Sequence, residues 1–196
     1  RAMMLAGAFP VNTDIQIFNI ATTGNAVDSG FDYGVSRYLG GAASDRTRGV
    51  YFGGYSLSAQ IRFNSIPSVG STTEFGNLTS ARFGGTGVSD STRGISLGGS
   101  AGPSTINAGI NEIEYVTIQS LGDAVDFGDL VQELASIQSC QSQTRGIISG
   151  GKEDSSNAAQ NGIEYITMST LGNASDFGDM SAVHNGNQCG GGGNAV

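Results

Sequence analysis

One segment of this chain occurs four times. The stretch from Ile113 to Leu130, IEYVTIQSLGDAVDFGDL, recurs without a gap from Ile163 to Met180 as IEYITMSTLGNASDFGDM. A more divergent copy, IRFNSIPSVGSTTEFGNL, begins at Ile61, and the most divergent one, IQIFNIATTGNAVD, begins at Ile15. Such repetition is typical of architectures in which each copy forms the same small unit and packs against its neighbours.

The spacing inside the copies is regular. A glycine follows each starting isoleucine by nine residues, at Gly24, Gly70, Gly122 and Gly172. Twelve or thirteen residues later come Arg37, Arg82, Leu134 and His184. Eleven residues after the first three of these lies a Thr-Arg-Gly sequence, centred on Arg48, Arg93 and Arg145, and an apolar run and a double glycine follow it. The repeat therefore measures about 45 to 52 residues.

The residue pattern within one copy favours strands. Ile113 to Ile118 is rich in β-branched and aromatic residues, and Gly94 to Gly99 is a short apolar run that ends in glycines. Phe127 to Leu130 fits an outer strand or its turn, and Arg82 to Val88 fits a weaker strand. No window shows a 3.6-residue apolar period. Three to four short strands in each repeat predict an all-β protein built from β-propeller blades.

Composition excludes several classes of function. The 196 residues carry a formal net charge of -8 and no Lys/Arg cluster, so we expect no nucleic-acid partner. No apolar run approaches the ~20 residues that span a bilayer, so we expect no membrane insertion. The two cysteines, Cys140 and Cys189, occupy nearly the same place in successive repeats, which argues against a disulfide framework.

The order of features in the repeat resembles the kelch-type propeller blade: an apolar run, a double glycine, a variable loop, an aromatic strand and a turn to Phe-Gly. The chain departs from kelch blades in having no tryptophan, and Phe75, Phe127 and Phe177 stand in the anchoring position. The sequence pattern GNAxDFGDL, followed by SDSTRG and a double glycine, is also similar to that of kelch-like repeat proteins of marine bacteriophages. That resemblance implies a virion or tail-fibre protein whose partners are other virion proteins or a host-surface glycan. A homo-oligomer is compatible with it.

The two ends of the chain match different parts of the repeat. Arg1 to Gly7 aligns with Arg145 to Gly151, and the last residues stop near the place of the next Thr-Arg-Gly. We therefore expect one propeller domain over residues 1–196, with repeat units of approximately 1–47, 48–92, 93–144 and 145–196. Both termini would complete one blade, which closes a four-bladed ring without open sheet edges. The alternative is a part of a longer array with more blades.

Catalytic motifs are incomplete, so we predict no enzyme. Ser96 lies in a Gly-x-Ser-x-Gly sequence, but no helix follows it and its partners would need a histidine. His184 is the only histidine, which is also too few for the copper site of some kelch-like oxidases.

The recurring polar and aromatic residues have structural and functional interpretations. Arg48, Arg93 and Arg145 fit either a cationic ring for an anionic ligand or, as we favour, arginines that bond carbonyls or an aspartate of the next blade. Asp126 and Asp176 precede Phe127 and Phe177 in Asp-Phe-Gly-Asp sequences. Calcium is the lesser alternative there, because such aspartates usually bind backbone N–H groups in turns. We expect no cofactor.

The loops that vary between copies are the candidate contact surface, because recognition usually lies in loops on a rigid scaffold. They are Ser100 to Asn111, Lys152 to Gly162 and the short Tyr55 to Gln60, with Asn107, Asn111, Asp154 and Asn157 as candidate contact residues. We expect a non-enzymatic virion module that presents these loops. The alternative is a lectin-like carbohydrate-binding propeller of a bacterial surface or secreted protein.

Overall fold

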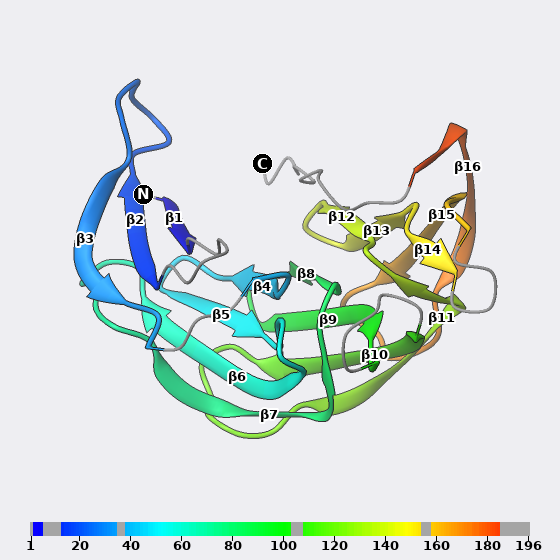
Figure 1. The fold of residues 1–196 in the computed structure, drawn as a ribbon, viewed down its shortest axis with the longest axis horizontal. Helices are drawn as coiled ribbons and strands as arrows, with labels where there is room; N and C mark the ends of the chain where they lie inside the picture. The colour runs from blue at the N-terminus through cyan, green and yellow to red at the C-terminus, as the bar shows by residue number, and fades with distance from the viewer. Residues whose placement is uncertain (1, 6–12, 35–37, 103–107, 154–157, 185–196) are drawn as a thin grey trace.

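The computed structural model describes residues 2–5, 13–34, 38–102, 108–153 and 158–184, and these form four antiparallel sheets (Figure 1). The prediction of an all-β protein is confirmed for this part of the chain, which contains no helix. It accordingly holds no helix that is long and apolar enough to cross a membrane.

The sheets follow one another along the chain. The first contains β1 (Ala2–Leu5), β2 (Asp14–Phe18) and β3 (Val27–Asp32), and the second contains β4 (Gly41–Ser44), β5 (Arg48–Phe52), β6 (Ser58–Ser65) and β7 (Thr73–Arg82). The third contains β8 (Thr86–Ser89), β9 (Arg93–Ser100), β10 (Gly109–Thr117), β11 (Val125–Ala135) and, beside β11, the short β14 (Lys152–Glu153). The fourth contains β12 (Gln138–Gln141), β13 (Arg145–Ser149), β15 (Gln160–Thr167) and β16 (Ser175–His184).

Each sheet is one copy of the repeat. The segments expected to be strands lie in β9, β10 and β11, and the weak strand expected from Arg82 to Val88 is divided between the end of β7 and β8. The expected unit boundaries at residues 48, 93 and 145 fall inside sheets, between the first and the second strand. Each of these sheets thus begins one strand before its Thr-Arg-Gly sequence.

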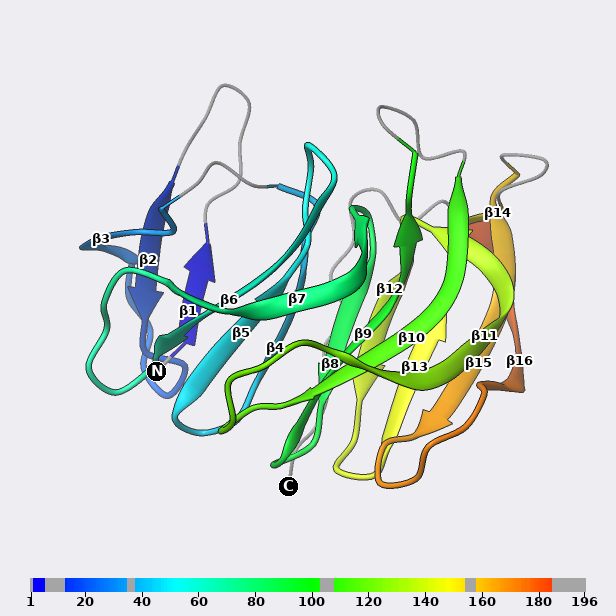
Figure 2. The same cartoon turned by 90° about the horizontal axis from the view of Figure 1, so that it is seen from below.

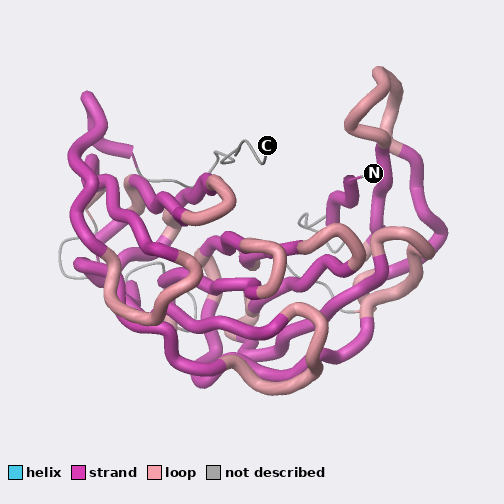
Figure 3. The backbone as a smooth tube through the Cα atoms, turned by 180° about the vertical axis from the view of Figure 1, so that it is seen from behind, coloured by secondary structure: helices cyan, strands magenta, loops and turns pink. Residues whose placement is uncertain are grey.

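The four sheets form a curled, open arc rather than a closed ring (Figures 1 and 3). Seen from below, the sheets stand side by side, with the first sheet at one end of the row and the fourth at the other (Figure 2). Closure of a four-bladed ring is therefore not confirmed. Residues 185–196, which would supply the strand needed for that closure, lie outside the described residues.

The first strands of the second, third and fourth sheets line the inside of the arc. They approach each other so closely that side chains are excluded at some positions. A Cβ on Gly87 of β8 would lie 2.4 Å from the carbonyl oxygen of Ala42 in β4. Glycine is required there, since any larger residue would push these two strands apart.

The core lies between neighbouring sheets. Val50, Phe52, Ile61, Phe75 and Leu78 of the second sheet pack against residues at and after β10, namely Val116, Ile118 and Ala124. The equivalent residues of the third sheet, including Phe127 and Leu130, pack in the same way against Ile148, Ile166, Met168 and Ala174. The second and third sheets therefore each bury an apolar face on the next sheet, and this burial drives the stacking of repeat units.

A charged pair is buried between the second and third sheets. Arg82, at the end of β7, forms an ion pair with Glu114 of β10, and both side chains are 2% exposed. The equivalent place between the third and fourth sheets holds Glu164 and, in the slot of Arg82, Leu134. Burial raises the pKa of Glu164, although the backbone N–H groups of Val131 and Gln132 act against that increase.

This difference predicts losses of stability of different size for the same substitution at the two interfaces. Glu114→Gln leaves the Arg82 guanidinium buried without its counter-ion, which should cost about 3–5 kcal/mol in free energy of unfolding. Glu164→Gln removes a carboxylate that burial already disfavours and keeps an oxygen for the Val131 N–H, so its cost should stay within about 1 kcal/mol. Urea unfolding of both variants at pH 7 tests this, and equal losses would contradict it.

Candidate binding site

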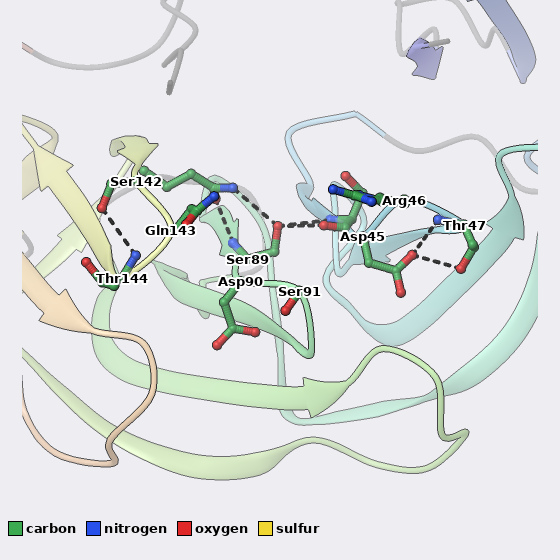
Figure 4. A pocket seen from close by; sticks show the side chains of 11 residues that line it. Asp45, Arg46, Thr47, Ser89, Asp90, Ser91, Ser142, Gln143 and Thr144 are labelled. Atoms are coloured by element: carbon green, nitrogen blue, oxygen red, sulfur yellow. Dashed lines mark hydrogen bonds between the residues drawn. The ribbon is translucent and has the colours of Figure 1, made fainter. Parts of the chain in front are cut away.

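Three equivalent turns line a cavity of about 770 Å³ on the inner side of the arc (Figure 4). They connect the first strand to the second in the second, third and fourth sheets. All the lining residues are polar or charged: Ser44, Asp45, Arg46, Thr47, Ser89, Asp90, Ser91, Gln141, Ser142, Gln143 and Thr144. The three-fold repetition of one turn thus creates a concave surface lined by polar side chains.

Each turn is closed by a side-chain oxygen at the same position. Asp45 Oδ1 accepts hydrogen bonds from the backbone N–H groups of Thr47, at 2.6 Å, and Arg48, at 2.7 Å. Asp90 makes the two equivalent bonds at 2.7 and 2.6 Å. The hydroxyl of Ser142 accepts them at 3.3 and 3.1 Å in the third turn. Short polar side chains favour such turns because they satisfy backbone donors that would otherwise need water.

Side chains also bind the turns to one another. Ser89 Oγ donates to the carbonyl oxygen of Ser44, at 2.8 Å, and accepts from the Ser44 N–H, at 3.2 Å. The Ser89 N–H donates to Gln141 Oε1 at 2.6 Å. Ser89 therefore connects all three sheets at the edge of the cavity, as the dashed lines of Figure 4 show. These bonds hold the lining in one arrangement before any ligand arrives.

The charges of the cavity are mixed, with the carboxylates of Asp45 and Asp90 and the guanidinium of Arg46. Burial alone would raise the pKa of Asp45, but hydrogen bonds from Thr47, Gln119 and Arg48 outweigh it and lower that pKa. Asp45 is therefore a carboxylate at neutral pH. A lining of this kind suits a ligand that both donates and accepts hydrogen bonds, and it disfavours a polyanion.

The recurring arginines contact the neighbouring sheet. Arg48 Nη1 donates to the carbonyl oxygen of Ile118 at 2.8 Å, and Arg93 Nη1 donates to that of Met168 at 2.9 Å. Their guanidinium groups also stack on aromatic rings of their own sheets, those of Phe63 at 4.5 Å and Tyr115 at 5.1 Å. Arg145, the first residue of β13 in the fourth sheet, stacks on Tyr165 at 4.8 Å. These three side chains do not line the cavity.

The Asp-Phe-Gly residues occupy the outer strands. Phe127 is 3% exposed, whereas Phe177 is 54% exposed, and each meets the tyrosine of the strand beside it edge to face, Tyr115 and Tyr165. Asp126 is exposed, and Asp176 Oδ1 accepts from the Gly178 N–H at 3.1 Å. Among the described residues, no three His, Cys, Asp or Glu side chains gather as a metal site would require.

The described residues of the expected contact loops lie at the other end of the sheets from the cavity. They connect second to third strands, whereas the cavity turns connect first to second strands, and successive connections of an antiparallel meander alternate between its ends. Asn111 was expected in a loop, but it lies in β10, because pairing with β9 begins as early as Gly109. Asn107, Asp154 and Asn157 fall outside the described residues, as does Cys189.

The motifs considered for catalysis lie in ordinary strands. Ser96 is 2% exposed within β9, and His184 ends β16. The residues that sequence analysis missed are Asp45, Asp90 and Ser142. Their signal was present in Ser-Asp-x-Thr-Arg-Gly, which occurs at Ser44 and Ser89 and is conservatively varied from Gln141.

Comparison of the chain with protein-family models and with curated proteins gives no match. Any functional assignment therefore depends on the geometry of the cavity and on the resemblance of the repeat to kelch-like phage proteins.

The lowered pKa of Asp45 predicts a pH-dependent contribution to stability. Because the folded-state pKa lies below the unfolded value of about 3.9, ionised Asp45 stabilises the fold above about pH 4, and this contribution disappears as pH falls through the folded-state pKa. Asp45→Asn should lower the free energy of unfolding by about 1 kcal/mol at pH 7 and have little effect at low pH. Urea unfolding against pH measures the difference.

The control is Asp126→Asn, which neutralises an exposed carboxylate of β11. It should change stability little at either pH. A deficit of Asp45→Asn that stays constant with pH, or one that Asp126→Asn shares, would contradict the role of the turn.

Proposed function

We propose that this chain is a kelch-like β-propeller module without enzymatic activity that serves in a bacteriophage virion, as part of a tail fibre or as a decoration protein. It presents a rigid binding surface to a host-surface glycan or to neighbouring virion proteins. The observation that carries the binding role is the cavity of about 770 Å³, whose lining residues all have polar or charged side chains. The virion setting is supported by the resemblance of the repeat to kelch-like repeat proteins of marine bacteriophages.

The chemistry of the cavity favours a glycan as the ligand. Sugar hydroxyls donate and accept hydrogen bonds, and the hydroxyl, amide and carboxylate groups of the lining complement both roles. The backbone of the turns is already held by Asp45, Asp90 and Ser142, so little order must be imposed on binding. A weak but preorganised site suits a particle that carries many copies, because avidity then supplies the affinity.

The alternative is a lectin-like carbohydrate-binding propeller of a bacterial surface or secreted protein, and the same polar cavity favours it. The two functions differ in where the chain is found. Mass spectrometry of purified virus particles should detect the chain if it is a virion protein. Its presence only in the medium or on the surface of bacterial cells would favour the alternative.

Filling the cavity tests the binding role. Ser91→Trp places an indole among the three turns and should weaken glycan binding at least about tenfold, because the ring takes the space of the ligand. Ser68→Trp, on the exposed loop between β6 and β7, is the matched control and should bind as the wild type does. A glycan array would identify the ligand and titration calorimetry would measure it.

Two results would contradict the proposal. One is a wild-type chain that binds no glycan on an array that includes surface polysaccharides of bacteria. The other is a Ser91→Trp variant that binds as tightly as Ser68→Trp.

A further inference from the structure

The fourth sheet exposes the surface that the second and third sheets bury against a neighbour. Phe75 and Phe127 are 4% and 3% exposed, whereas the equivalent Phe177 is 54% exposed. Ile61 and Ile113 are fully buried, whereas Ile163 is only partly buried. The fourth sheet lies at one end of the arc (Figure 1). This end therefore presents an apolar face built for contact with a further sheet.

The equivalent faces of the second and third sheets show how such a face binds a neighbouring sheet. The Gly122 N–H donates to the Phe75 carbonyl at 3.0 Å, and the Ala124 N–H donates to that of Asn77 at 2.8 Å. Asp123 Oδ1 accepts from the Asn77 N–H at 2.8 Å. A Gly-Asx-Ala turn thus docks on the outer strand of the preceding sheet.

The next interface repeats these bonds. The Gly172 and Ala174 N–H groups donate to the carbonyls of Phe127 and Asp129, at 2.8 and 2.7 Å. Asn173 Oδ1 accepts from the Asp129 N–H at 3.1 Å. At both interfaces the turn fits against a glycine, since a Cβ on Gly76 or Gly128 would lie 2.1 or 2.5 Å from the carbonyl oxygen of the docked glycine. At Gly178 nothing lies within 4 Å, so the same space is open.

The first sheet, at the opposite end of the arc, carries a turn of the kind that binds this face. The turn between β2 and β3 reads Gly24-Asn25-Ala26, the same Gly-Asx-Ala sequence, and all three residues are exposed. Ile20 is 73% exposed, although its equivalents Ile118 and Met168 are fully buried between sheets. The hairpin that bears this turn projects at the end of the arc in Figures 1 and 3.

We propose that the exposed face of the fourth sheet binds the first sheet of a second copy of this chain, head to tail. The argument is continuity, because one chain already forms this contact between its second and third and between its third and fourth sheets. Gly24 and Ala26 of one copy donate to the carbonyls of Phe177 and Asp179 of the other, and Asn25 accepts from the Asp179 N–H. Arg145 reaches the Ile20 carbonyl, as Arg48 and Arg93 reach the carbonyls of Ile118 and Met168.

Because the chain is curved, two copies joined by this contact at both ends would close into a ring-shaped dimer. The four sheets bend into a half-barrel arc (Figure 1), so two arcs joined at both ends form one ring of twice four sheets. A ring with two-fold symmetry leaves no exposed sheet end, and eight blades lie within the range of known propellers. A head-to-tail contact that failed to close would instead form filaments.

Sedimentation equilibrium tests the proposal on the whole chain. The wild type should be a dimer at micromolar concentration. Phe177→Glu and Ile20→Glu should each raise the dimer dissociation constant by about 30-fold or more, because each places a charge in an apolar contact. Both residues are exposed in one copy, so the variants should keep the wild-type circular dichroism spectrum. The matched control is Val183→Glu, also in β16, whose equivalent in the covered third sheet is the exposed Glu133.

Mixing the two variants separates head-to-tail contact from other dimers. Phe177→Glu keeps an intact first sheet and Ile20→Glu keeps an intact fourth sheet, so an equimolar mixture should regain dimers through one native contact. A monomeric wild type would overturn the proposal and favour closure within one chain. So would a Phe177→Glu variant that dimerises normally, a Val183→Glu variant that dissociates equally, or a mixture that stays monomeric.

Discussion

The arc depends on one contact, in which a short turn of each sheet forms backbone hydrogen bonds with the outer strand of the preceding sheet. The residues around Gly122 and Gly172 make this contact, and a simpler version joins the first two sheets through the Thr72 N–H and the Asp32 carbonyl, at 3.2 Å. Backbone groups at the edge of a buried apolar face must be paired, and the turn pairs them. Because the contact recurs once in every repeat, each sheet is stabilised by its neighbours and the cooperative unit is the stack.

The same close stacking explains why the concave side is polar. At Gly87, beside Ala42, the strands on the inside of the arc are too close for any larger residue. Hydroxyl groups such as that of Ser89 can bond backbone atoms of the adjacent strand at this distance. Most of the buried apolar residues lie farther out between the sheets, and the turns at the inner edge carry polar side chains. The cavity follows from the packing of the strands that support it.

Much of the local structure could be predicted from the sequence, because it depends on local spacing. The Ile and Tyr residues of Ile113 to Ile118 indicated a strand, as observed. Of the three phenylalanines expected as anchors, Phe75 and Phe127 are buried, whereas Phe177 is exposed. The curvature of the arc could not be predicted, since it is set by how side chains fit between sheets and not by the length of the repeat. Asn111 was misplaced because its polar surroundings resemble a loop, whereas backbone pairing with β9 extends the strand through them.

The interfaces between sheets differ in the contacts made by the residue equivalent to Glu114, and comparing them shows which contacts the stacking needs. Glu114 pairs with Arg82 and also accepts from the Thr79 N–H at 2.8 Å. Glu164 keeps the bond to a backbone N–H, that of Val131 at 2.9 Å, but its equivalent of Arg82 is Leu134. In the second sheet the slot holds Arg62, which instead bonds Thr72 of its own sheet.

The charge in this slot therefore changes sign between interfaces while the sheets stack in the same way. A buried ion pair gives little net stability once desolvation is counted. At the next interface Leu134 replaces the arginine while Glu164 keeps its bond to the Val131 N–H, so the sheets stack there without the ion pair. The backbone hydrogen bonds of the docking turn are instead the same at both interfaces, because they do not depend on which side chains the bonded residues carry. For this reason the turn, and not the ion pair, determines how one repeat binds the next.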